Sequence, residues 1–126
     1  MNAALPPTLL FVDDEVRILS ALRRVLRREG WRILTAETPE QALRILGEQE
    51  VDVIVTDQKM PGMSGLQLLA EAARRRPRAR RLLITGWTEA VPPEEVASLG
   101  IRALIPKPWD DADLKAILRR LVEERG

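Results

Sequence analysis

Short apolar runs alternate along this chain with longer stretches in which apolar residues recur every three or four positions. The first pattern is typical of buried strands, and the second is typical of amphipathic helices that cover a sheet. The expected strands are residues 8–12, 32–36, 51–57, 80–85 and 101–105. The expected helices are residues 18–29, 39–49, 65–76, 94–99 and 110–122. This alternation predicts an α/β protein of five βα units, with a parallel sheet and helices on both of its faces.

Local signals mark several helix ends. Gly30 stands where a glycine C-cap would end the first helix. Thr38, Pro39 and Gln41 have the order of a cap, a first-turn proline and a capping-box partner for the second helix. The fourth helix is expected to be short, because the prolines at positions 92 and 93 are compatible with a helix only in its opening turn.

Four of the first five residues of the strand at residues 51–57 are apolar, and the strand ends on a carboxylate, Asp57. Turn signals at Pro61-Gly62 and Ser64-Gly65 follow it directly. Asp57 is therefore expected at the carboxyl end of a central strand, where open α/β sheets bind their ligands. The alternative is that Asp57 is only a turn residue or a helix cap, since aspartate favours both places.

Other polar residues follow the remaining strands. Asp13 and Asp14 follow the first, Thr85 ends the fourth, and Lys107 comes shortly after the fifth. Right-handed crossovers would bring all of these strand ends to one edge of the sheet. Each residue also has a structural alternative: helix caps for the two aspartates, a turn hydroxyl for Thr85 and a solvated charge for Lys107. Their joint occurrence at strand ends favours a shared site.

Phosphoryl transfer to a carboxylate is the chemistry that these groups could perform together. Clustered carboxylates repel one another, and a hard cation such as Mg²⁺ relieves the repulsion. The Lys107 ammonium and the Thr85 hydroxyl could bind phosphoryl oxygens while one aspartate attacks in line. Asp57 is the best candidate for the attack because it stands alone on the central strand, whereas the adjacent Asp13 and Asp14 suit the metal.

Composition narrows the function classes further. The 126 residues are enough for one domain with a single core, and the net charge of +1 indicates no polyanionic partner. The chain has no Cys and no His, which excludes disulfides, thiol nucleophiles and Ser/His/Asp hydrolysis. No segment has the character of a signal peptide or a membrane span. The sequence thus predicts a cytoplasmic domain without a membrane partner.

These motifs, in this order and spacing, resemble the receiver domain of response regulators, the phosphoacceptor half of bacterial two-component systems. The resemblance covers residues 8–126 and leaves 1–7 as an N-terminal tail. It depends on Asp13-Asp14, Asp57, Met60-Pro61-Gly62-Met63-Ser64-Gly65, Thr85-Gly86 and Lys107-Pro108-Trp109. It implies a flavodoxin-like fold of strand order 2-1-3-4-5.

The resemblance also implies roles for single residues. Asp57 would accept a phosphoryl group from a sensor histidine kinase or a phosphotransfer protein, so the domain would be a switch rather than an enzyme. Mg²⁺ would be held by Asp13, Asp14, Asp57 and the backbone carbonyl of Lys59. The Lys107-Pro108 peptide would be cis. Phosphorylation would change binding of an unknown output domain or protein at the fourth helix, fifth strand and fifth helix, and the motifs are most similar to receivers found beside cyclic-dinucleotide phosphodiesterase or other output domains.

Three positions bear on the switch and on the phosphoryl lifetime. Leu104 stands where the family usually has Tyr or Phe, so the usual coupling of that ring to Thr85 is absent. Our hypothesis is that the short fourth helix shifts instead, within residues 88–99. Lys59 and Trp87 flank the expected path of the hydrolytic water, where Trp87 would either hinder that water or only cover the loop.

Alternatives of other classes remain open. A receiver-like module that binds without phosphorylation is disfavoured by the complete set of site residues. A Mg²⁺-dependent phosphatase would need its attacking aspartate on the first strand with a second aspartate two residues later, and the sequence there reads Asp13-Asp14-Glu15-Val16. The six arginines between Arg74 and Arg81 are predicted to be a solvated loop rather than a nucleic-acid site. Dimerisation is left open.

Overall fold

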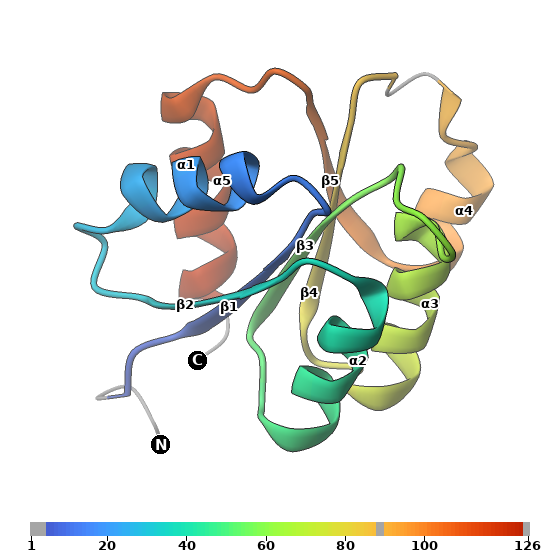
Figure 1. Ribbon diagram of the computed structural model, residues 1–126, viewed down its shortest axis with the longest axis horizontal. Helices are drawn as coiled ribbons and strands as arrows, with labels where there is room; N and C mark the ends of the chain where they lie inside the picture. The colour runs from blue at the N-terminus through green and yellow to red at the C-terminus, as the bar shows by residue number, and fades with distance from the viewer. Residues whose placement is uncertain (1–4, 88–89, 125–126) are drawn as a thin grey trace.

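The structure is a computed structural model that describes residues 5–87 and 90–124 (Figure 1). The first four residues of the expected tail, residues 88 and 89 of the expected switch segment, and the last two residues lie outside the described part. The strands are β1 (Thr8–Val12), β2 (Arg32–Ala36), β3 (Val53–Asp57), β4 (Arg80–Thr85) and β5 (Ile101–Pro106). The helices are α1 (Val16–Leu26), α2 (Pro39–Glu48), α3 (Gly65–Arg75), α4 (Pro93–Ser98) and α5 (Asp111–Glu123).

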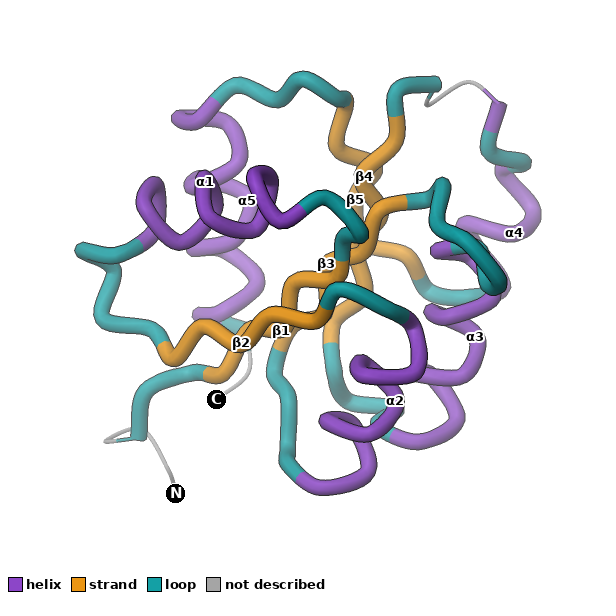
Figure 2. Tube along the Cα trace, viewed as in Figure 1, coloured by secondary structure: helices purple, strands orange, loops and turns teal. Residues whose placement is uncertain are grey.

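The five strands form one parallel sheet in the order β2-β1-β3-β4-β5 (Figure 2). Helices α1 and α5 pack on one face, and α2, α3 and α4 lie on the other (Figure 1). Every residue of β1 and β3 is buried, as expected for central strands that are covered on both faces. The predicted flavodoxin-like fold and its strand order are confirmed.

The bounds of the third strand and of the first helix, which begins at Val16, differ from the predictions by two or three residues, and the other bounds differ by at most one. The third strand begins at Val53 rather than at residue 51; Asp52, just before it, is held to the start of β1, where its carboxylate accepts the Thr8 N–H at 2.7 Å. The first helix ends at Leu26, where a tighter turn forms as the Glu29 N–H donates to the Leu26 carbonyl at 3.0 Å. Gly30 is therefore not the C-cap; it has a φ of 81° in the loop beyond.

The other helix starts agree with the sequence. Thr38 caps α2 by accepting the Gln41 N–H at 3.1 Å, with Pro39 in the first turn. Asp110 caps α5 by accepting the Asp113 N–H at 3.0 Å. Helix α4 is short, as predicted, and none of its residues is buried. Since so little of α4 is buried, it is the least anchored helix of the domain.

The arginine-rich segment is only in part a solvated loop. Arg78 is exposed, but three other arginines donate to backbone carbonyls at the carboxyl ends of three different helices. Arg76 donates to the Leu46 carbonyl of α2 at 2.8 Å. Arg80 donates to the Glu124 carbonyl at the end of α5 at 2.7 Å, and Arg81 donates to the Leu99 carbonyl at the end of α4 at 2.7 Å. These guanidinium groups satisfy helix-end carbonyls that have no partner within their helix.

None of the helices in the described part combines the length and apolar character needed to cross a bilayer.

Candidate functional site

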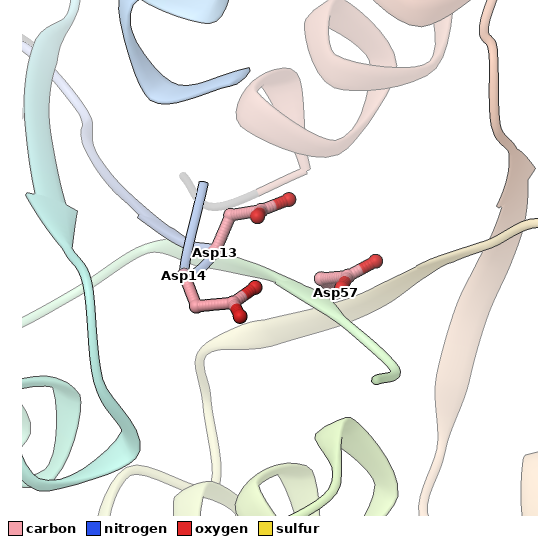
Figure 3. A group of neighbouring side chains, drawn as sticks. All are labelled: Asp13, Asp14 and Asp57. Atoms are coloured by element: carbon pink, nitrogen blue, oxygen red, sulfur yellow. The ribbon is translucent and has the colours of Figure 1, made fainter. Parts of the chain in front are cut away.

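Three carboxylates meet at the carboxyl edge of the sheet. Asp57 is the last residue of β3, and Asp13 and Asp14 directly follow β1, which pairs with β3. Figure 3 shows the three side chains close together at these strand ends, and one carboxylate oxygen from each lies within 4.8 Å of the others. Asp13 and Asp57 are buried, and Asp14 is exposed. The structure thus brings together the three aspartates that the sequence singled out.

Lys107 lies among these carboxylates. Its Nζ is 3.2 Å from Asp57 Oδ1 and 3.3 Å from Asp13 Oδ2, and it also approaches Glu15 Oε1 at 3.7 Å. The lysine is therefore not a solvated charge. The Glu15 contact was not predicted; Glu15 is the N-cap residue of α1 and directly follows Asp13 and Asp14. The Lys107-Pro108 peptide is cis, as expected.

The electrostatics of the site follow from burial and from these contacts. Burial raises the pKa of Asp57, with the Asp14 charge adding to the shift and Lys107 opposing it. Burial also raises the pKa of Asp13, whose Oδ1 accepts the Glu15 N–H at 2.8 Å. Burial alone would lower the pKa of Lys107, but the charges and hydrogen bonds of Asp13 and Asp57 outweigh it and raise that pKa. The ionised carboxylates are thus only partly compensated by Lys107, and the oxygen-rich set suits a hard divalent cation.

Thr85 is buried at the end of β4, which pairs with β3 beside Asp57. Its Oγ1 accepts the Trp87 N–H at 3.2 Å, which is the contact expected of a turn hydroxyl. The hydroxyl proton is not used by that bond and can be donated to another group. Thr85 and Asp57 line the same cleft, so both interpretations of Thr85 are compatible with the structure.

The helix-cap alternative for Asp57 is wrong. Ser64 is the N-cap of α3, because its Oγ accepts the Gln67 N–H at 3.2 Å while Gln67 Oε1 accepts the Ser64 N–H at 2.9 Å. This capping box has the Ser-x-x-Gln spacing, so the sequence contained a signal for it. Gly65, the next residue, lies directly against the backbone of Asp57.

The remaining candidates lie around the cleft or away from it. Lys59 and Trp87 line the cleft, and Trp87 is 70% exposed at its rim. Leu104 does not line it; it borders a separate apolar groove between α4 and β5, together with Val91 and Val96. Gln58, which sequence reasoning did not single out, is also part of the cleft wall. No sequence signal identifies Gln58, because its contacts depend on how α3 packs.

Taken together, the fold and the site define a doubly wound α/β domain with an acidic site, closed on one side by a lysine, at the carboxyl edge of its sheet. The family model described as "Response regulator receiver domain" matches residues 9–119. The chain therefore belongs to the response regulator receiver family.

Relatives and solved structures agree with this assignment. The chain is 39% identical over 123 residues to the hydrogenase transcriptional regulatory protein HoxA of Cupriavidus necator, covering 94% of this chain and 25% of HoxA. It is 35% identical over 127 residues to PetR of Rhodobacter capsulatus, covering 98% of this chain and 53% of PetR. The chain thus spans from a quarter to about half of the length of these curated relatives.

Two solved structures have the same fold throughout. The receiver domain protein (CheY-like) of Methanospirillum hungatei superimposes with a TM-score of 0.87 at 27% identity, covering 96% of this chain and 97% of that one. The signal receiver domain of an HD domain-containing protein from Pseudomonas fluorescens gives a TM-score of 0.87 at 30% identity, covering 96% and 98%.

Proposed function

We propose that Asp57 accepts a phosphoryl group from a sensor histidine kinase or a phosphotransfer protein. The supporting observation is the position of the Asp57 carboxylate, which lines an open cleft, contacts Lys107 and lies beside Asp13 and Asp14. An Asp57 oxygen attacks phosphorus as the bond to the donor's histidine nitrogen breaks, and the leaving imidazole takes up a proton. The chain is itself the acceptor, so no separate substrate is turned over.

The other groups of the site support this transfer. Asp13, Asp14, Asp57 and the backbone carbonyl of Lys59 would hold Mg²⁺, which supplies positive charge to neutralise the phosphoryl oxygens. Lys107 supplies a second positive charge from the opposite side, and the Thr85 hydroxyl donates a hydrogen bond to a phosphoryl oxygen. Hydrolysis reverses the state: water attacks phosphorus, the bond to Asp57 breaks, and the carboxylate is regenerated.

The test of this proposal is the intact mass of the protein after incubation with Mg²⁺ and acetyl phosphate, a donor that needs no protein partner. A single phosphoryl adduct that EDTA abolishes supports the proposal. An unlabelled protein, or labelling that persists in EDTA, contradicts it.

Phosphorylation is proposed to switch an output through α4, β5 and α5. Support comes from α4, which buries none of its residues, and from Leu104 on β5, which borders the groove beside α4 instead of filling it with an aromatic ring. On binding beryllofluoride, a phosphoryl mimic, we expect the amide hydrogens of residues 94–99 to change their exchange rates severalfold. Those of α2 should not change. Identical rates in α4 with and without the mimic would exclude this route.

Trp87 is proposed to lengthen the phosphoryl lifetime by hindering the hydrolytic water, since its ring stands exposed at the rim of the cleft. Trp87→Ala is expected to hasten loss of the phosphoryl group by about threefold, equivalent to roughly 0.7 kcal/mol in the barrier. The measurement is the decay of the phosphorylated mass after the donor is removed. Trp87→Phe keeps most of the bulk and should decay like the wild type; an unchanged rate for Trp87→Ala would mean that the ring only covers the loop.

The wider setting of the domain is part of the same proposal. Residues 8–126 form the receiver domain, and residues 1–7 precede it as a tail. The named relatives HoxA and PetR are longer than this chain, which supports a role beside an output domain or an output partner. We place the domain in the cytoplasm, since a histidine kinase draws its phosphoryl groups from ATP.

A further inference from the structure

The loop between β3 and α3, residues 58–64, carries the Lys59 carbonyl and begins with Gln58. Lys59 itself is exposed and makes no hydrogen bond or ion pair with the rest of the described chain. The orientation of its carbonyl therefore depends on how its neighbours are held. Gln58 is one such neighbour, and it is half-buried in the wall of the cleft.

Gln58 satisfies the first backbone groups of α3 from outside the helix. A helix begins with N–H groups that have no partner within it. The Gly65 N–H donates to the Gln58 backbone carbonyl at 2.9 Å, and the Leu66 N–H donates to Gln58 Oε1 at 2.9 Å. The third such group, the Gln67 N–H, donates to Ser64 Oγ at 3.2 Å. Two of these three bonds thus end on one residue.

Gln58 is also attached to the sheet. Its own N–H donates to the Ile84 carbonyl of β4 at 3.0 Å. Backbone and side chain together hold it at three points, one on β4 and two on α3. Residues that hold a metal ligand from behind orient that ligand, and their loss commonly weakens metal affinity by about 10- to 100-fold.

We infer that Gln58 is a positioning residue for the metal site: by attaching the loop to the first turn of α3, its side chain orients the Lys59 carbonyl toward the cation held by the three aspartates. This inference depends on the proposed Mg²⁺ site and deepens it. The side-chain bond to Leu66 is the part of the arrangement that a substitution can remove, since the two backbone bonds do not depend on residue type.

The experiment compares Gln58→Met with Gln67→Met in the full chain, with Mg²⁺ affinity measured by isothermal titration calorimetry. Both substitutions remove one side-chain acceptor at the start of α3. Gln58→Met removes the bond from the Leu66 N–H to Gln58, the neighbour of Lys59, whereas Gln67→Met removes the bond from the Ser64 N–H to Gln67. We expect Gln58→Met to bind Mg²⁺ about tenfold more weakly. Gln67→Met should stay close to the wild type, while both variants lose a similar amount of thermal stability.

A second variant and a second measurement keep the result decisive. Gln58→Asn keeps the amide but is one methylene too short, so it should weaken Mg²⁺ binding as Gln58→Met does. The carbonyl ¹³C shift of Lys59 should respond to Mg²⁺ in the wild type and respond less in both Gln58 variants. Equal Mg²⁺ affinity for wild type and both Gln58 variants, or equal weakening by Gln67→Met, would overturn the inference alone. A wild type that binds no Mg²⁺ would overturn the proposed site as well.

Discussion

Asparagine at position 57 is expected to abolish the phosphoryl adduct that the wild type gains from acetyl phosphate and Mg²⁺. The amide is a poor nucleophile, and the other aspartates of the site are placed differently: Asp13 is engaged by the Glu15 N–H and by Lys107, and Asp14 is exposed. Intact mass spectrometry measures the effect directly. Asp52→Asn is the matched control, because Asp52 bonds to Thr8 at the other end of the β3 strand, and this variant should still be labelled. Labelling of Asp57→Asn equal to the wild type would place the acceptor elsewhere.

Loss of the adduct has meaning only if Asp57→Asn is folded, and we expect it to be the more stable protein at pH 7 in EDTA. Burial raises the pKa of Asp57 above its ordinary value of 3.8, so the ionised carboxylate opposes folding. Below pH 3.8 the Asp57 carboxyl is protonated in both the folded and the unfolded state, so it does not oppose folding. The destabilisation by the ionised carboxylate grows as the pH rises from there through the raised pKa of the folded state. The gain is roughly 1.4 kcal/mol for each unit by which the pKa is raised. Urea unfolding at pH 7 and near pH 3.5 should show the gain only at pH 7.

Alanine at position 65 is expected to destabilise the fold by about 2 kcal/mol, within the usual cost of overpacking. A Cβ on Gly65 would clash with the Asp57 carbonyl oxygen and would lie 2.7 Å from Leu83 Cδ1. Both neighbours are buried, and the Asp57 carbonyl cannot retreat without moving the β3 strand, which ends on Asp57. The clash outweighs the better helix propensity of alanine, which is worth only about 1 kcal/mol. Urea unfolding at pH 7 measures the loss.

Gly47→Ala is the matched control for this effect. Gly47 also lies in a helix, α2, but nothing stands within 4 Å of a Cβ built there. Alanine at this position should stabilise the protein by roughly 0.5–1 kcal/mol. The two substitutions are chemically identical, so a difference in sign isolates the contacts with Asp57 and Leu83. If Gly65→Ala were as stable as the wild type, the start of α3 would not be tightly packed against the end of β3.

The sequence by itself determined the order of the strands and helices, because hydrophobic periodicity is a local property of the chain. It also identified the polar residues at the strand ends, and the motif resemblance supplied the strand order of the sheet. Local chemistry was equally reliable where a helix start depends on neighbouring residues, as at Thr38 and Asp110. It was misleading at Gly30, since a glycine can follow a helix end at several distances.

Only the tertiary structure decided which distant residues meet. Lys107 and Asp13 are 94 positions apart, and their contact depends on β1 and β5 ending at the same edge of the sheet. The packing of α3 against the sheet determines what Gln58 binds, and the packing of α4 and α5 determines where Arg80 and Arg81 donate. No local pattern encodes these contacts, because each requires two elements that the chain brings together only when the whole sheet has formed.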